Sequence, residues 1–426
     1  MQHFVVAVVV AAVYLALAAI SSVVAYAPAD AWTVWLSSGV VFGLLVSLPR
    51  ARWVAVLAGG FVGASAFATW LGSPPLDAIG YGAIEVIASG GAALAVSRLT
   101  TLPILFERPR ELVALILGGA LPLALTGAVL ATAWHVAASS PSPMATFRVW
   151  VISNFIGTLL VAPMVIAWSQ FRPRRSGGMT MPAFAAGAVA CVLFLGSLWL
   201  LFDAPASDRF GGSVGQSLTY APMLFIALLA LLWGTRGATL AAFVGALIAI
   251  VNTAQGEGPF ASVEGFLGEA ELEVEGYALA IALMGLLIAV LSAAQRVAVR
   301  TARDWQTRFD AAICAHRLLA YEWDPASGRI VVTGDSLQLL GVAPARLATL
   351  ADFLALVAGA DRDRVAARFD ERVRGQGEAD TLTYGVAGAG GGALVATDEA
   401  RVIRDHDGAL HRIVGIVRIA PAVAQA

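Results

Sequence analysis

Residues 274–303 read VEGYALAIALMGLLIAVLSAAQRVAVRTAR, and this stretch decides the fold. Its central part, 276–295, has twenty residues without a charge, and three arginines follow within the next eight positions. A helix of roughly 20 apolar residues crosses the hydrocarbon core of a bilayer. The stretch therefore predicts a last membrane crossing, followed by a segment that lies in water.

The same change of composition divides the whole chain near residue 296. Residues 1–296 carry 12 Arg and 13 acidic residues, whereas the much shorter segment 297–426 carries 15 Arg and 16 acidic residues. Only 13% of the chain is charged, against roughly 25% in soluble domains. We therefore predict an integral membrane domain at 1–296, a connecting helix at 297–315 and a small cytosolic domain at 316–426.

Ten apolar runs precede the boundary and predict a polytopic α-helical bundle of about ten spans. They are 4–27, 32–48, 53–71, 76–97, 111–137, 147–169, 182–202, 218–233, 236–254 and 274–295. Counted from a cytoplasmic amino terminus, the inner loops hold 12 Arg and the outer loops only Arg148 and Arg209. Cytoplasmic loops collect positive charge. We expect a protein of the bacterial inner (plasma) membrane with the lipid bilayer around it and both termini in the cytoplasm.

Polar residues in three of these runs fall at one depth. Glu85 lies roughly 12 Å from the outer end of its run, and Asn154 roughly 10 Å, at 1.5 Å per residue. Ser37 and Ser38 lie at a similar level in the second run, directly after Trp35. Ionisable groups inside a membrane are costly and usually functional. If the runs face one another, this layer forms a pocket for an unknown small ligand, open to the outside.

Each of these residues also has a purely structural interpretation. Ser and Asn often join helices by hydrogen bonds, and Trp35 suits the aromatic belt at a membrane surface. His135, at the outer end of the fifth run, is either a pH sensor or an interfacial anchor. Glu85 is the strongest candidate, because we expect it to be the one charge buried in the membrane.

The segment after the last run predicts a helix that can pair with another copy. Ala298, Ala302, Trp305, Phe309 and Ala312 recur at spacings of four and three residues, as in a two-stranded coiled coil. We expect Trp305 and Phe309 to take part in signal transfer. A homodimer, or a heterodimer with another protein, is the predicted assembly.

The tail predicts an α+β domain. A hairpin fits 319–323 and 329–332 around a Gly328 turn, helices follow near 335–341, 350–357 and 361–374, and strands fit 380–386, 394–404 and 410–419. This order predicts an antiparallel sheet with helices on one side. Near-neutral charge gives no argument for nucleic acid, and the two cysteines form neither a disulfide framework nor a metal motif.

The tail resembles the PAS domain of bacterial signalling receptors. The resemblance rests on Tyr321-Glu322-Trp323-Asp324 with the Ser327-Gly328 turn, Leu339-Leu340-Gly341, 360–365, 404–408 and 413–415. It implies a PAS-like α+β fold with Trp323 and Asp324 among its characteristic positions. The cofactor stays unknown, since the Cys-centred flavin motif, a suitable haem-binding His and a metal motif are all missing.

The membrane part resembles the first group of membrane-associated sensor domains, the MASE family of bacterial histidine kinases and cyclic-di-GMP enzymes. The matching residues are Trp35 to Gly39 ahead of 50–53, Gly82 to Glu85 with Arg98, and 150–154 with Gly157 and 161–163. Relatives usually have a Pro pair after Trp35 and an Asp in place of Asn154. The resemblance implies a sensor that takes part in two-component or cyclic-di-GMP signalling.

No phospho-acceptor His motif, ATP-binding Gly boxes, cyclase signature or phosphodiesterase signature follows. We therefore expect a receptor without catalysis of its own, or the front part of a longer kinase or cyclase. Two alternatives stay open. One is a transporter with a regulatory tail, and the other is a non-catalytic scaffold for a partner kinase or cyclase.

Overall fold

The computed structural model describes residues 2–24, 33–137, 142–169, 180–203, 218–261, 268–374, 379–388, 393–406 and 408–421. The chain divides into two compact units, Met1–Val297 and Ala298–Ala426. We call them the membrane unit and the C-terminal unit.

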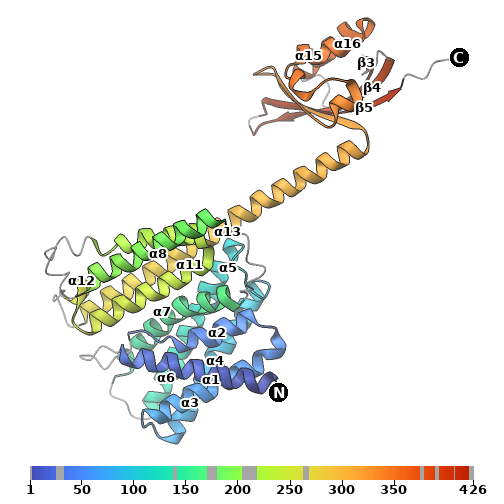
Figure 1. The fold of residues 1–426 in the computed structure, drawn as a ribbon. Helices are drawn as coiled ribbons and strands as arrows, with labels where there is room; N and C mark the ends of the chain where they lie inside the picture. The colour runs from blue at the N-terminus through green and yellow to red at the C-terminus, as the bar shows by residue number, and fades with distance from the viewer. Residues whose placement is uncertain are drawn as a thin grey trace. The chain divides into compact units, whose positions relative to one another are not determined.

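The membrane unit is built from helices alone within its described residues (Figure 1). They are α1 (Gln2–Val23), α2 (Ser37–Ser47), η2 (Arg50–Arg52), α3 (Trp53–Trp70), α4 (Pro75–Leu99), α5 (Pro109–Val113), the π-helical stretch η3 (Ala114–Ala120), α6 (Leu121–Ala137), α7 (Pro143–Ser169), α8 (Met181–Phe202), α11 (Ala221–Ala254), α12 (Gly258–Ala261) and α13 (Glu269–Ala315), which crosses the boundary between the units. Proline opens several of them, because the first helical position needs no N–H donor.

Eight helices of the described residues are long and apolar enough to cross a membrane. The polytopic helical bundle is therefore confirmed, while the count of ten stays a prediction. The difference lies in α2, which has only 11 residues, and in α11, which is one helix by length but breaks at Gly234 (φ 66°, ψ −152°). Ile226 and Ala238 both lie beside Gly285 of α13, although twelve residues of straight helix would separate them by roughly 18 Å. The chain doubles back at Gly234, between two of the predicted runs.

Small residues set the closest helix contacts. A Cβ on Gly63 of α3 would lie 2.8 Å from the Tyr14 ring of α1, and one on Gly39 of α2 would lie 2.7 Å from Val161 of α7. Glycine lets helix backbones approach closely where a bilayer supplies no hydrophobic drive for association. These contacts bring α1, α2, α3 and α7 to the positions from which the site is built.

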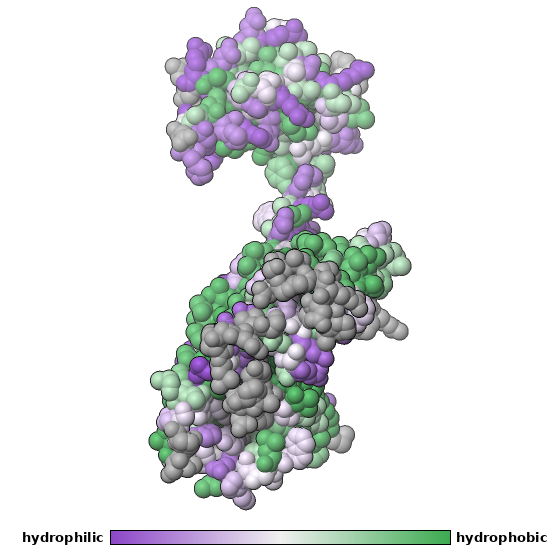
Figure 2. Space-filling view, turned by 90° about the vertical axis from the view of Figure 1, so that its left-hand side faces the viewer, coloured by the Kyte–Doolittle hydropathy of each residue, from purple (hydrophilic) through white to green (hydrophobic). Residues whose placement is uncertain are grey.

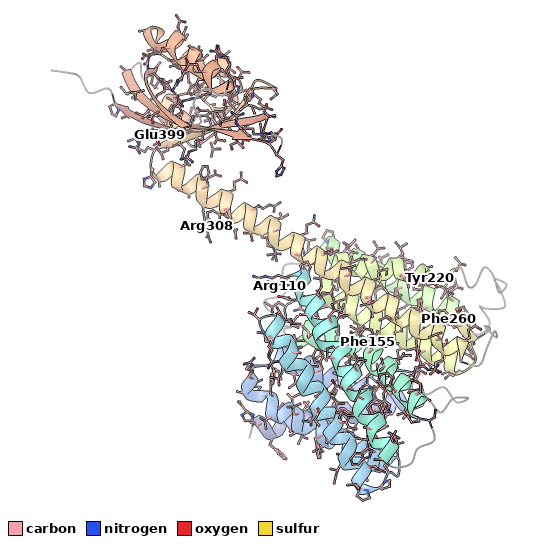
Figure 3. All side chains as sticks on the ribbon, turned by 180° about the vertical axis from the view of Figure 1, so that it is seen from behind. Arg110, Phe155, Tyr220, Phe260, Arg308 and Glu399 are labelled. Carbon is pink, nitrogen blue, oxygen red and sulfur yellow. The ribbon has the colours of Figure 1, made fainter. Side chains whose placement is uncertain are left out.

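The surface of each unit matches its composition. Figure 2 shows apolar side chains over much of the visible surface of the membrane unit and polar side chains over that of the C-terminal unit. Exposed valine and leucine side chains recur along α1, α4 and α8, as helices facing lipid require. Arg110 lies at one end of the membrane unit and Phe260 at the other, with Phe155 of α7 between them (Figure 3).

One expectation about buried charge is wrong. Glu275 is only 8% exposed and Glu111 only 5%, so Glu85 is not the one buried acid of the membrane unit. The Glu-rich segment before the last run is helical from Glu269 onward, so Glu275 packs inside the bundle. Glu111 accepts backbone N–H bonds from Leu105 and Glu107, which explains its burial at a helix start.

The C-terminal unit is a five-stranded sheet with helices on one face (Figure 1). Its strands are β1 (Leu318–Asp324), β2 (Arg329–Thr333), β3 (Ala379–Ala387), β4 (Ala393–Arg404) and β5 (Leu410–Pro421), all antiparallel, in the order β2-β1-β5-β4-β3. Between β2 and β3 lie α14 (Ser336–Leu340), η4 (Pro344–Arg346), α15 (Leu350–Leu356) and α16 (Gly359–Val373). The predicted antiparallel α+β arrangement is confirmed.

A charged cluster lies inside this unit. Arg372 of α16 is 1% exposed and forms ion pairs with Asp380 and Asp398, each at 2.9 Å. Tyr321 donates a hydrogen bond to Asp398 (3.2 Å). Burial raises the pKa of Asp398, and the neighbouring Arg372 opposes this rise. Buried charges persist only when paired, so the cluster joins α16 to the sheet.

Candidate functional site

A cavity of about 230 Å³ lies inside the membrane unit, and we call it the Glu85 cavity. It runs from Leu71 and Ser73, in the connection after α3, down to Glu85 of α4. Five aromatic side chains contribute to its wall: Tyr14, Trp35, Phe67, Tyr81 and Trp150. Among the described residues, no Arg or Lys lines the cavity. Its outer part lies at the bundle end opposite the Arg-rich connections that hold Arg50 and Arg98.

Glu85 forms the polar floor of this cavity. Its carboxyl group meets hydroxyls from three helices: Ser38 of α2 at 2.7 Å, Ser89 of α4 at 2.5 Å and Tyr14 of α1 at 3.2 Å. The indole of Trp35 in turn hydrogen-bonds to the Tyr14 hydroxyl. Glu85 is 6% exposed, so its charge state depends on these neighbours rather than on bulk water.

Ser38 connects Glu85 to a third span. Its Oγ lies 2.7 Å from Oε2 of Glu85 and 3.1 Å from Oδ1 of Asn154 on α7. The amide nitrogen of Asn154 already donates to the backbone oxygen of Trp150. The three side chains from α2, α4 and α7 therefore form one network, which we call the Glu85 network.

The oxygen–oxygen distances favour one protonation state of this network. A serine hydroxyl has one hydrogen, yet Ser38 faces two acceptor oxygens. Rotating the Asn154 amide would place its oxygen 2.9 Å from the Trp150 carbonyl, oxygen against oxygen. All contacts are satisfied when Glu85 is a neutral acid that donates from Oε2 to Ser38, and Ser38 donates to Asn154. The arrangement thus holds one proton.

The sequence builds this site by starting α2 inside the bundle. Residues 34–36 form no helix, and the backbone N–H of Trp35 donates to Ser153 of α7 (2.9 Å). A Cβ on Gly157 would lie only 1.9 Å from the carbonyl oxygen of Trp35. Irregular backbone at membrane depth is tolerated where it is buried in protein. Gly157 therefore lets this segment lie against α7 and places Ser38 beside Glu85.

Polar aromatic groups surround the outer part of the cavity. Tyr81 and Trp150 stack with ring centroids 6.1 Å apart. The Tyr81 hydroxyl lies 3.2 Å from Nε2 of His135, whose Nδ1 lies 2.8 Å from the Ala131 carbonyl. A neutral ring that donates from Nδ1 to the carbonyl and accepts at Nε2 satisfies both contacts. His135 is thus held in place at the mouth rather than at the floor.

The structure brings together most of the residues that the sequence analysis selected in the membrane. Glu85, Asn154, Ser38, Trp35 and His135 all line the cavity. Ser37 does not, because its hydroxyl donates to the backbone oxygen of Tyr14 (2.9 Å). Their role in ligand sensing stays a prediction.

The selected residues after the membrane unit lie elsewhere. Trp305 is 68% exposed and Phe309 47%, on the part of α13 beyond the bundle. Trp323 is buried and packs edge-on against Phe369 (5.4 Å). Asp324 accepts hydrogen bonds from Ser327 and the following backbone, and these bonds lower the pKa of its carboxyl group. Trp323 and Asp324 thus stabilise the core and the first turn.

Three residues of the site were missed by the sequence analysis: Tyr14 and Tyr81, which line the cavity, and Ser89, which contacts Glu85. Tyr14 stands in an apolar run where nothing distinguishes it from a packing residue. Ser89 could have been found, since it follows Glu85 by four positions and therefore shares its helix face. Tyr81 lies four positions before Glu85 in the same run but was given no role. Among the described residues, no group of three His, Cys, Asp or Glu side chains could hold a metal ion.

Comparison with known proteins gives a family match for the membrane part. Residues 4–296 match the MASE1 family. A search of curated proteins finds no match. The N-terminal domain of a diguanylate cyclase with PAS/PAC sensor from Marinobacter aquaeolei is similar over 24% of this chain and 93% of its own, with 15% identity and a TM-score of 0.23. A sensory box histidine kinase/response regulator from Burkholderia thailandensis is similar over 27% of this chain and 85% of its own, with 17% identity and a TM-score of 0.22.

Proposed function

Because this chain belongs to the MASE1 family, a family of membrane sensor domains, we propose that it is a bacterial inner-membrane receptor whose input site is the Glu85 cavity. The observation that carries the proposal is the Glu85 network at the cavity floor. A buried acid that joins three helices and lines an open cavity can respond to an occupant, and the helices it joins can then shift together.

The proposed orientation places the cavity mouth in the periplasm. Arg50, Arg52, Arg98, Arg108 and Arg110 lie at the opposite bundle end, and cytoplasmic ends collect arginine. The α13 helix begins at Glu269 in the membrane unit and continues to Ala315, across the boundary into the C-terminal unit. It is therefore the element that can carry a change in the bundle to the C-terminal unit, which belongs in the cytoplasm.

We assign the C-terminal unit to the PAS class from its topology. The sheet order β2-β1-β5-β4-β3, with the helices placed between β2 and β3, supports this assignment. The exposed Trp305 and Phe309 support pairing of α13 with a second copy or with a kinase or cyclase that supplies the output. A chain that senses without catalysing would act through such a partner.

The receptor proposal is preferred over a transporter for one reason. A transporter needs alternating access to its site from both sides of the membrane. Within the described residues, the cavity lining extends from the mouth to Glu85 and includes none of the arginines at the other end. A site that opens on one side is sufficient for a receptor.

Filling the cavity with a side chain tests the proposal without a known ligand. A Cβ on Gly127 of α6 would meet its nearest neighbours only at 3.9 Å, so Gly127→Leu should occupy the cavity. Gly91→Leu, on the exposed face of α4 with open space around it, is the matched control. In full-length protein in nanodiscs, we expect Gly127→Leu to change hydrogen exchange along 298–312 and Gly91→Leu to leave it unchanged. Identical exchange in both variants would refute the proposal.

A further inference from the structure

We infer that the Glu85 cavity binds a small organic amine in its protonated form, and that the ammonium replaces the proton held by the Glu85 network. This inference rests on the proposed function, because it names the chemical class of the occupant at the same site. It follows from the proton count, from the cavity wall and from the charges around the cavity.

When Glu85 is ionised, the Glu85 network needs a cationic hydrogen-bond donor beside Ser38. Without its proton, Glu85 is a carboxylate that takes the single hydrogen of Ser38, and Oδ1 of Asn154 is left facing an oxygen lone pair. An ammonium group has three N–H donors. Placed beside Ser38, it can donate both to Glu85 and to Asn154, and it neutralises the buried carboxylate. No neutral ligand satisfies both requirements.

The wall of the cavity also suits a cation. Five aromatic rings line it, and the faces of such rings attract cations. Tyr14 and Trp35 lie next to the floor, with ring centroids 6.3 Å apart, and Phe67 lies 5.6 Å from Trp35. With about 230 Å³, the cavity has room for roughly eight non-hydrogen atoms at about 30 Å³ per water-sized group. The occupant is therefore a small amine with an apolar body.

The charged and titratable groups around the floor favour a cation over an anion. Tyr14 of α1 is the titratable group in contact with Glu85. The helices α2 and α3 present Ser38 and Gly60 to it, and Asn154 of α7 contacts Ser38. His135 and Tyr81 line the mouth, and nearby the carboxylate of Asp77 accepts a hydrogen bond from the indole N–H of Trp134. Since the described part of the lining includes no Arg or Lys, it offers no counter-charge to a phosphate or carboxylate.

The exchange is balanced in atoms and charge. The neutral Glu85 acid and a free ammonium ion give a carboxylate–ammonium pair inside the cavity and one proton in solution. Amines of the alkyl type stay protonated at neutral pH, with pKa values near that of lysine. Binding must therefore strengthen about tenfold for each unit of rising pH, until the free protein itself loses the Glu85 proton.

Benzylamine and benzyl alcohol are suitable probes, because they have the same size and differ in charge. Binding to the full-length chain in phosphatidylcholine nanodiscs is measured by calorimetry, in two buffers of different ionisation enthalpy, across neutral pH. We expect benzylamine to bind with release of one proton and about tenfold gain per pH unit, and benzyl alcohol to bind at least tenfold more weakly. Benzylamine binding that is independent of pH, or equal to benzyl alcohol binding, would overturn the inference.

Variants assign the effect to Glu85. Glu85→Gln should fold, since its amide can donate to Ser38 as the neutral acid does, and it should bind benzylamine about a hundredfold more weakly without proton release. Glu111→Gln makes the same change in a buried acid at the other bundle end and should bind as wild type does. His135→Gln should retain the proton release, which excludes the mouth imidazole as its source. Proton release that persists in Glu85→Gln would contradict the inference.

A last comparison tells a lipid headgroup from a free solute as the source of the amine, and it keeps the test of the amine site independent of the test of the receptor proposal. Nanodiscs with phosphatidylethanolamine, whose headgroup is a primary ammonium, compete with benzylamine if the natural occupant is a lipid, and have no effect if it is a free solute. Both results support an ammonium site. Should benzyl alcohol bind as well as benzylamine, the inference fails, while the cavity-filling test of Gly127 still decides the receptor proposal.

Discussion

Gly157→Ala is the substitution that most directly perturbs the backbone support of the site. The new Cβ would lie 1.9 Å from the Trp35 carbonyl oxygen, whereas real Cβ contacts stay above 3.0 Å. The two backbones must therefore move apart by at least 1.1 Å (3.0 − 1.9). That movement strains the bond from Trp35 to Ser153 and displaces Ser38, three residues further on.

The cost follows from known magnitudes. Overpacking costs about 1–3 kcal/mol. Weakening of the hydrogen bonds between Trp35 and Ser153 and between Ser38 and Glu85 adds about 1 kcal/mol each. Alanine returns about 1 kcal/mol through its better helix propensity. We expect the free energy of unfolding to fall by about 2–4 kcal/mol.

The assay is a denaturant titration of the full-length protein in mixed micelles. Gly196→Ala in α8 is the matched control, because a Cβ there meets nothing within 4 Å, and it should be neutral or slightly stabilising. If Gly157→Ala and Gly196→Ala have the same stability, the close approach of the 34–36 segment to α7 does not hold the site together.

Three further predictions concern the C-terminal unit. Gly415→Ala would place a Cβ 2.4 Å from the Tyr321 ring and should destabilise the sheet by about 1–3 kcal/mol, seen as faster hydrogen exchange in β5. Arg372→Met leaves Asp398 as an unpaired buried charge and should cost about 3–5 kcal/mol, measured as loss of protection in β4. Hydrogen bonds from Arg364 and the Gly385 backbone lower the pKa of Asp361. The contribution of this carboxylate to stability is therefore present above its unfolded-state pKa and is lost as pH falls through its folded-state pKa. Acid unfolding curves of wild type and Asp361→Asn should converge at low pH.

Each of these has a control in the same unit. Gly359→Ala enters open space, and Arg374→Met and Asp363→Asn alter exposed side chains of the same region. We expect all three to behave as wild type does. Equal effects in a variant and its control would show that burial and contact geometry do not determine the outcome.

Much of the site was predicted from the sequence, by counting how far each polar residue lies from the outer end of its run. Glu85, Ser38 and Asn154 were placed in one layer from their distances to run ends, and they meet in the structure because their helices are adjacent. Polar residues are rare in apolar runs, so their positions are informative. Tyr14 could not be selected in the same way, because nothing in its apolar run distinguishes a packing tyrosine from a site residue.

Other features needed three-dimensional information. The start of α2 inside the bundle depends on the contact of Gly157 with Trp35, which spans more than a hundred residues. Glu275 stands at the start of the last predicted run, where a charge usually marks the end of a span, yet the helix begins at Glu269 and places Glu275 inside the bundle. In the tail, alternation and turn residues predicted every strand, but the buried Arg372 lies on a helix with so many charges that none was distinctive.

The most direct test of the input role of Glu85 is made on the last turn of α13. Cys314 is exposed and can carry a nitroxide label once Cys191 is changed to Ser. We predict that the label spectrum of Glu85→Gln matches that of the parent, because the network keeps its donor, whereas Glu85→Ala changes the label's mobility or spacing. An unchanged spectrum in Glu85→Ala would contradict the claim that the Glu85 network controls this helix.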